Sequence, residues 1–146
     1  MKITEIKKDL FDFKADVYVH CISLDCEMGA GIAKQFVRYF PYMKAALIEF
    51  VKYNNCTVPT SLAYRYNGNT VVNLITKEHY WDKPTYKTLE GALIGLRKYC
   101  IKHDINTVAM PYIGCGLDKL SWDKVKPMIE ETFKDTNIDI TVCSIK

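Results

Sequence analysis

Lys77 is the residue whose place in the sequence most strongly suggests chemistry. It directly follows TVVNLIT (residues 70–76), a nearly continuous apolar run that predicts a strand buried on both faces. The lysine should therefore leave an apolar setting near the edge of a sheet. Partial burial favours the neutral amine, which is the form that attacks an electrophilic carbon. The alternative is a lysine that extends into solvent from a strand end and does no chemistry.

Asp118 is the second candidate, because it follows a glycine-containing loop and precedes a predicted helix. A carboxylate there can face a ligand as a general acid or base, or it can merely begin the cap of the helix. If it lies near Lys77, it favours the charged ammonium form and opposes the effect of burial. Either burial outweighs the pairing or the two groups act at different steps, and the sequence leaves both open.

Two glycine pairs suggest a phosphate-binding function. Gly29 and Gly31 lie in the segment 23–36, and Gly114 and Gly116 lie in the segment 111–122. Each pair follows a predicted strand and precedes a predicted helix, where backbone N–H groups can approach phosphate oxygens. One such pair is as often a plain turn and cap. Two pairs together favour a diphosphate ligand.

A cysteine nucleophile or a metal site is the alternative to chemistry by Lys77. Cys115 lies between two glycines near helix amides, where a thiol can become acidic, but no histidine lies nearby in the sequence to activate it. His20, Cys21 and Cys26 could gather round a metal, yet no fourth ligand is evident. The six cysteines include no CxxC pair, so we expect free thiols, no metal and no cofactor.

The elements that position these residues follow from the apolar pattern. Predicted strands are 17–22, 62–66, 70–76, 107–110 and 139–145. Predicted helices are 31–40, 42–53, 85–103 and 121–133. Asn67-Gly68 predicts a tight turn, and therefore an antiparallel hairpin within a mixed sheet. Strands buried on both faces imply helices on both sides, so residues 1–146 should form a single three-layer α/β/α domain with a mixed, mostly parallel central sheet.

Helix ends and a proline add local expectations. Thr85 can cap the third helix and Ser121 the fourth, while Pro127 should bend or restart the fourth helix. Ligands of such sheets lie outside the carboxyl ends of the strands. The loops after 17–22, 70–76 and 107–110 are therefore expected to share one site.

Net charge and the length of the apolar segments indicate which ligands and which location to expect. A net charge of +3 with interspersed acids and bases suits a phosphate-bearing small molecule better than a long nucleic-acid track. No segment approaches the roughly 18 apolar residues of a membrane span, and the N-terminus lacks a signal-like apolar run. We therefore expect a cytoplasmic protein with no membrane partner.

Four segments carry a family resemblance: HCISLDCEMGAGIA, LITK, KPTY and MPYIGCGLDKLSW. They resemble the macrodomains of the terminal ADP-ribose protein glycohydrolase class, which remove ADP-ribose from acidic side chains. The likeness spans nearly the whole chain. Bacterial and phage relatives of the class include antitoxins that strip ADP-ribose from DNA. The resemblance thus implies a macrodomain that binds ADP-ribose, or ADP-ribosylated protein or nucleic acid, and acts as a monomeric hydrolase.

The resemblance also implies roles for individual residues. Lys77 would attack the anomeric carbon of the distal ribose and form a transient covalent adduct, and Asp118 would help to release it. Asp9 would accept a hydrogen bond from the adenine amino group, and Ser23 would contact the ribose. The implied ligand-binding residues are Asp9, Leu10, His20, Ser23, Met28, Gly29, Ala30, Gly31, Ile32, Thr76, Pro111, Ile113, Gly114, Cys115, Gly116 and Leu117.

The chain departs from relatives at three places. VHCISLD (residues 19–25) replaces an asparagine-rich VNAAN-like stretch, which disfavours the branch that works through an asparagine and ordered water. Close relatives carry an aromatic residue near the position of Cys143. Tyr80 and Trp81 follow Lys77 as an unusual aromatic pair that either contacts the modified partner or packs locally.

Three functions fit these features. The first is a hydrolase that releases ADP-ribose from acidic side chains, from O-acetyl-ADP-ribose or from nucleobases. The second is a module that binds ADP-ribose without cleaving it, because the same pocket serves both. The third is a phosphatase acting on ADP-ribose 1″-phosphate, which gives Lys77 no obvious role.

Overall fold

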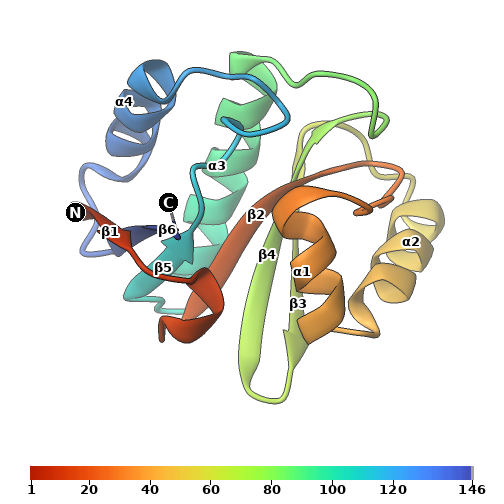
Figure 1. The fold of residues 1–146 in the computed structure, drawn as a ribbon, viewed down its shortest axis with the longest axis horizontal. Helices are drawn as coiled ribbons and strands as arrows, with labels where there is room; N and C mark the ends of the chain where they lie inside the picture. The colour runs from red at the N-terminus through yellow and green to blue at the C-terminus, as the bar shows by residue number, and fades with distance from the viewer. Residues whose placement is uncertain (146) are drawn as a thin grey trace.

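The computed structural model describes residues 1–145, and within them the secondary structure alternates between strands and helices (Figure 1). The strands are β1 (Lys2–Lys7), β2 (Val17–Ser23), β3 (Thr60–Tyr66), β4 (Asn69–Lys77), β5 (Thr107–Met110) and β6 (Asp139–Ser144). The helices are α1 (Gly31–Tyr39), α2 (Met43–Tyr53), α3 (Tyr86–Lys102) and α4 (Trp122–Phe133), with a short 3-10 helix η1 (Leu10–Asp12).

The strands form one sheet in the order β1-β6-β5-β2-β4-β3. Every neighbouring pair is parallel except β3 and β4, so the expected mixed, mostly parallel sheet is confirmed. The antiparallel pair is the predicted hairpin. Asn67 and Gly68 both have positive φ, 50° and 78°, which is the backbone that a two-residue hairpin turn requires.

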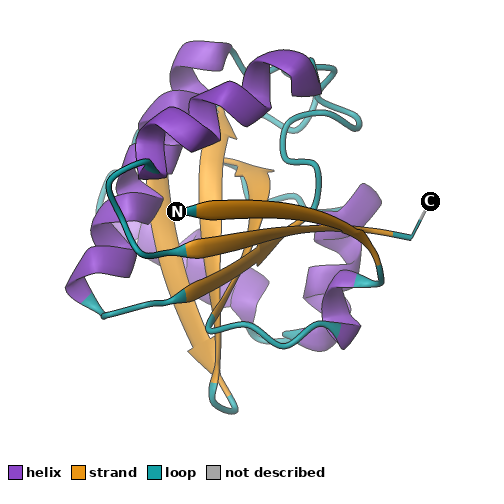
Figure 2. Ribbon diagram, turned by 90° about the vertical axis from the view of Figure 1, so that its left-hand side faces the viewer, coloured by secondary structure: helices purple, strands orange, loops and turns teal. Residues whose placement is uncertain are grey.

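Helices cover both faces of the sheet, which confirms the three-layer α/β/α architecture (Figure 2). Successive side chains of β4 alternate between two apolar clusters. Val72 and Leu74 pack in the cluster with α3 and α4, whereas Val71 and Ile75 pack in the cluster with α1 and α2. The apolar run before Lys77 is thus buried on both faces, as its composition predicts.

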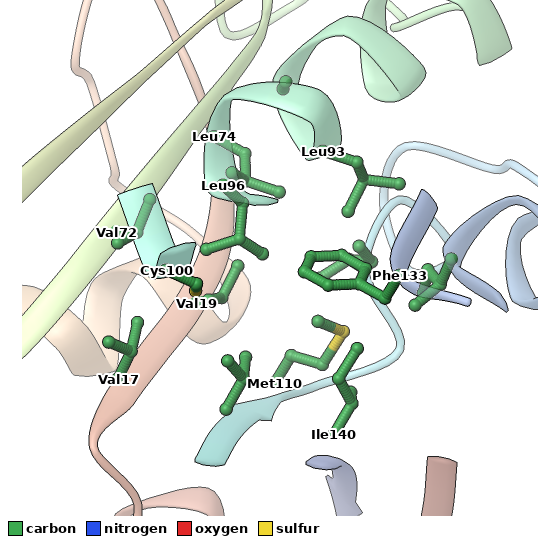
Figure 3. Packing of buried hydrophobic residues seen from close by; sticks show 14 of the residues in the cluster. Val17, Val19, Val72, Leu74, Leu93, Leu96, Cys100, Met110, Phe133 and Ile140 are labelled. Carbon is green, nitrogen blue, oxygen red and sulfur yellow. The ribbon is translucent and has the colours of Figure 1, made fainter. Parts of the chain in front are cut away.

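Helix α3 packs on the sheet through the residues that the apolar pattern of its sequence predicts. Its predicted apolar stripe, Leu89, Leu93, Leu96 and Cys100, is fully buried on the sheet, beside Val19 and Met110 (Figure 3). Its first turn is capped as predicted. The Thr85 side chain accepts a hydrogen bond from the Thr88 backbone N–H at 3.0 Å, and the Thr88 hydroxyl accepts one from the Thr85 N–H at 3.0 Å.

Three local expectations differ from the structure. Strand β1 is not among the predicted strands, because its apolar residues are interrupted by charged and polar ones. It lies at the edge of the sheet. Ser121 occupies the N-cap of α4, but its side chain makes no capping hydrogen bond. Of the two effects predicted for Pro127, a bend or a restart, the restart was wrong: α4 is one continuous helix through Pro127, and Val125, Ile129 and Phe133 bury completely in the core and hold it in place.

The loops that follow β2, β4 and β5 leave the sheet at the same end, at the top of Figure 1. This is the end at which parallel α/β sheets bind ligands. No helix among residues 1–145 is long and apolar enough to cross a membrane.

Candidate functional site

A cavity of about 980 Å³ opens at this end of the sheet. Its walls come from both glycine loops, from Lys77 at the end of β4, from Asp9 before η1 and from Cys143 on β6. The volume lies at the upper end of the range of roughly 300–1,000 Å³ that small-molecule sites occupy. Segments far apart in the sequence therefore build one ligand-sized hollow.

The structure brings nearly all of the predicted site residues to this cavity. His20 and Thr76 alone among them do not line it. Those that do are Asp9, Leu10, Ser23, Met28, Gly29, Ala30, Gly31, Ile32, Lys77, Pro111, Ile113, Gly114, Cys115, Gly116, Leu117 and Asp118.

His20 lies beneath the cavity, inside the core. Its Nε2 atom is 2.6 Å from the Asn73 side-chain oxygen, and its ring stacks on Phe36 with centroids 4.0 Å apart. Burial lowers the pKa of His20 to about 4, although the hydrogen bond with Asn73 opposes this shift. The imidazole is therefore neutral near pH 7 and packs as a core side chain.

Thr76 is buried and borders a second, smaller pocket together with Thr85 and Thr88 at the start of α3. The cause is an irregularity in the pairing of β2 with β4. Ile22 pairs with Ile75, but the next residue of β2 pairs with Lys77, so Thr76 is an extra residue without a partner on β2.

Lys77 and Asp118 form an ion pair in the cavity wall. The Lys77 Nζ donates to the Asp118 Oδ1 at 2.7 Å, and the two side chains are only 12% and 14% exposed. Lys77 therefore does not extend into solvent. The contact is short enough for direct proton transfer between the ammonium group and the carboxylate.

The first glycine loop presents the amino end of α1 to the cavity. No side chain caps this end, and no acidic residue lies in the first turn. The first N–H groups of a helix lack intrahelical acceptors and carry a partial positive charge. Gly31 has a φ of +59°, a conformation that glycine adopts without steric cost. This end of α1 is suited to an anionic group such as phosphate.

The second glycine loop uses its two glycines differently. Gly114 has a φ of +73°, and a Cβ atom there would lie 3.1 Å from the Leu120 Cδ1 atom. Gly116 needs no positive φ, and a Cβ atom there would meet nothing within 4 Å. Gly116 thus lines the cavity with open space beside it, whereas the positive φ at position 114 favours glycine for the backbone itself.

Cys115 does not have the surroundings of a reactive thiol. Burial raises its pKa, and its Sγ atom donates to the Ile113 carbonyl oxygen at 3.3 Å. A protonated thiol is a poor nucleophile, so these surroundings favour a structural Cys115 over a nucleophilic one. No group of three or more His, Cys, Asp or Glu side chains comes together to hold a metal within residues 1–145.

Asp9 combines a structural contact with access to the cavity. Its Oδ1 atom accepts a hydrogen bond from the Phe11 N–H at 3.0 Å and so caps η1. Its side chain also borders the cavity near Cys143.

Some lining residues were absent from the sequence prediction. Gln35 follows Gly31 by one turn of α1, so the i, i+4 spacing on the helix could have identified it. Lys83 also lines the cavity, and its Nζ donates to the Leu117 carbonyl oxygen at 2.7 Å. This contact joins the loop after β4 to the second glycine loop, and only the tertiary structure reveals it.

The aromatic pair after Lys77 lies at the rim of the cavity. Tyr80 is 57% exposed and lines the cavity, and its neighbour Trp81 is 64% exposed. Trp81 stacks on His79 with ring centroids 4.5 Å apart. The rings therefore contact each other but are not covered by the rest of the protein.

Comparisons with known proteins agree with this geometry. The family model of the Macro domain matches residues 19–129. ADP-ribose glycohydrolase OARD1 of Homo sapiens is 41% identical over 145 residues, which is 99% of this chain and 92% of that protein. A DNA ADP-ribosyl glycohydrolase of Mycobacterium tuberculosis is 26% identical over 136 residues, 90% of this chain and 39% of that protein. The solved macrodomain of Thermus aquaticus DarG superposes with a TM-score of 0.88 at 21% identity, covering 97% of each chain. The chain belongs to the macrodomain family.

Proposed function

We propose that the protein is a hydrolase that binds ADP-ribose and removes it from a modified partner through Lys77 and Asp118. The observation that carries this proposal is the 2.7 Å contact between the two side chains in the wall of a ligand-sized cavity. The relative with 41% identity is named an ADP-ribose glycohydrolase, which supports the same activity here.

The walls of the cavity suggest how ADP-ribose lies in it. The uncapped amino end of α1 and the open space beside Gly116 suit the diphosphate. Asp9 is the acceptor for the adenine amino group, and the distal ribose lies against Lys77. Cys143 lines the part of the cavity in which the adenine lies, so the base packs there on a thiol instead of an aromatic ring.

The reaction divides into two displacements at the anomeric carbon. Asp118 first accepts a proton from the Lys77 ammonium group, and the neutral amine attacks the anomeric carbon. The bond from that carbon to the partner breaks, and the partner leaves with the bonding electron pair. Water then displaces Lys77, which releases ADP-ribose and regenerates the amine. These steps require neither a metal nor a cofactor.

The alternatives explain less of the site. A module that only binds ADP-ribose has no need for an amine paired with a carboxylate in the cavity wall. A phosphatase acting on ADP-ribose 1″-phosphate leaves Lys77 without a role. The candidate substrates carry ADP-ribose on an acidic side chain, on an acetyl group (as O-acetyl-ADP-ribose) or on a nucleobase. We further propose that residues 1–146 form one domain that acts as a monomer in the cytoplasm.

The Lys77→Ala variant tests the proposal. The wild type and this variant are incubated with a peptide carrying ADP-ribose on glutamate, with O-acetyl-ADP-ribose and with ADP-ribosylated single-stranded DNA, and released ADP-ribose is measured. Turnover should fall by about 10³-fold or more, because the nucleophile is lost. The Kd of ADP-ribose, measured by calorimetry, should change little.

Lys87→Ala is the matched control, because Lys87 is exposed on α3 and lies outside the cavity lining. It should retain wild-type turnover. Full turnover in Lys77→Ala would remove the mechanism. Binding without release from any of the three substrates by the wild type would instead support the module that only binds ADP-ribose.

A further inference from the structure

Asp25 joins two loops of the site without lining the cavity that the described residues enclose. Its Oδ1 atom accepts hydrogen bonds from the Ser23 hydroxyl and from the Glu27 N–H, the latter at 3.1 Å. Its Oδ2 atom accepts one from the Tyr80 N–H at 3.0 Å. One carboxylate therefore holds the loop after β2 and the loop after β4 together.

The segment that Asp25 holds begins at Lys77. The extra residue Thr76 shifts the register of β4 just before this lysine, so Lys77 pairs with Ser23 outside the register of the rest of the two strands. Two backbone hydrogen bonds continue the contact beyond the irregularity. The Leu24 N–H donates to the Lys77 carbonyl at 2.8 Å, and the Asp25 N–H donates to the Glu78 carbonyl at 3.2 Å. The place of Lys77 therefore depends on residues 24 and 25.

The three hydrogen-bond donors around Asp25 match a carboxylate. Partial burial raises the pKa of Asp25, but the Ser23 hydroxyl and the Tyr80 and Glu27 N–H groups outweigh it and hold the pKa below its ordinary value. All three partners are donors, so an amide in place of the carboxylate would turn its own N–H group towards one of them. In addition, Ser23 lines the cavity, and because its proton is donated to Asp25 it can only accept from a ligand.

We propose that Asp25 is a positioning residue that directs Lys77 into the cavity and towards Asp118, and that turns the Ser23 hydroxyl into an acceptor for a sugar hydroxyl. The proposal rests on the proposed function, because it takes Lys77 as the attacking group. Asp25 acts through these neighbours and touches no reacting atom.

The Asp25→Asn variant tests this role against Asp82→Asn. Asp82 is a suitable control because it is a carboxylate of the loop after β4, which Asp25 also contacts, but it bonds within its own turn, to the His79 N–H at 3.0 Å. In Asp25→Asn, kcat should fall by about 10- to 100-fold, because small displacements of a reacting group have effects of this size. The Kd of ADP-ribose should change far less than kcat, and Asp82→Asn should retain wild-type kcat. A wild-type kcat in folded Asp25→Asn, or an equal loss in Asp82→Asn, would overturn the proposal.

A second readout needs no turnover. An amine-specific reagent labels the ligand-free protein, and peptide mass spectrometry compares the labelling rate of Lys77 with that of exposed Lys87. Lys77 should be labelled about tenfold faster in Asp25→Asn than in the wild type, because its shielded contact with Asp118 is disturbed. Unchanged labelling would contradict the positioning role even if the wild type releases ADP-ribose.

The two readouts separate the two proposals. Faster labelling of Lys77 in a protein whose wild type releases no ADP-ribose would support the positioning role and refute the proposed function. If Asp25→Asn does not fold, Asp25→Glu keeps the charge and moves the carboxylate by one methylene group. The same changes in kcat and labelling are then expected, with smaller size, and their absence would overturn the proposal.

Discussion

Gly114 and Gly116 are close in sequence but have different reasons to be glycine. Gly114 adopts a left-handed backbone against the Leu120 side chain, so any larger residue is strained there. At Gly116 the protein leaves open space that a side chain would fill. Substitution at the first should therefore affect folding, and substitution at the second should affect the ligand.

A pair of valine substitutions tests this difference. Gly116→Val should keep the wild-type melting temperature but weaken ADP-ribose binding by about tenfold or more, because the isopropyl group occupies the cavity. Gly114→Val should lower the melting temperature, because a β-branched residue is strained at positive φ. Calorimetric titration and thermal unfolding of both variants provide the measurements. Unchanged affinity in Gly116→Val would show that ADP-ribose does not lie against this loop.

Residue types alone pointed to Lys77 and to both glycine pairs, because a lysine after a buried strand and repeated glycines before helices are visible in the sequence. The sequence could not show that Asp118 reaches Lys77, since this depends on the path of the loop after β5. Thr76 and His20 were included by resemblance, yet both side chains lie outside the cavity lining. Thr76 is itself the extra residue in the pairing of β4 with β2, and this irregularity has no sequence signal, because it depends on how two strands pair.

At the scale of elements, the loop between β4 and α3 is the part of the site that faces outward. Trp81 is exposed and supported by His79, beside the ring of Tyr80 that lines the cavity. In the proposed binding mode, a partner attached to the distal ribose leaves the cavity near Lys77, which this loop follows directly. The exposed Trp81 is therefore placed to contact the partner, whereas Tyr80 and Lys83 of the same loop line the cavity itself.

The Trp81→Ala variant tests this placement. The KM for ADP-ribosylated single-stranded DNA should rise by about 5- to 100-fold, because stacking of a base on an aromatic side chain contributes roughly 1–3 kcal/mol. The Kd of free ADP-ribose should stay unchanged. Tyr53→Ala is the control, since Tyr53 is an exposed aromatic residue on α2 outside the cavity lining. If both variants behave like the wild type with polymeric substrates, the aromatic pair has no role in recognition.

Most elements were predictable because each carries its own local signal. The hairpin at Asn67-Gly68 follows from a turn that requires two positive φ angles, and the start of α3 follows from the Thr85 cap. Strand β1 carries no such signal, since its partner β6 lies at the other end of the chain. Likewise, the penalty for Pro127 is local, whereas the burial that keeps α4 continuous is a property of the packed core.

At the scale of the whole molecule, the buried His20 couples stability to pH. Burial lowers its pKa from the ordinary 6.5 to about 4, so between these values the unfolded chain binds a proton that the folded protein excludes. Stability from this group is complete above about pH 6.5 and is lost as the pH falls towards 4.

His20→Gln should remove this dependence. Between pH 7 and pH 4 the wild type should lose about 3 kcal/mol more unfolding free energy than the variant, by the linkage between pKa and stability. Urea unfolding at several pH values provides the measurement. His79 is exposed in the loop after β4, and the unfolding free energy of His79→Gln should show the same pH dependence as that of the wild type. Parallel pH profiles for the wild type and His20→Gln would contradict the assignment of a buried, neutral imidazole.

The proposed mechanism requires a covalent bond between Lys77 and the distal ribose during turnover. The glycosylamine adduct can open its ribose ring to an imine, which a borohydride reductant converts into a stable secondary amine. Wild-type protein incubated with an ADP-ribosylated peptide and this reductant, then digested, shows by mass spectrometry which residue carries the sugar. The reduced adduct should lie on Lys77 and be absent from Lys77→Ala. Turnover with unmodified Lys77, or an adduct on Cys115, would contradict the mechanism.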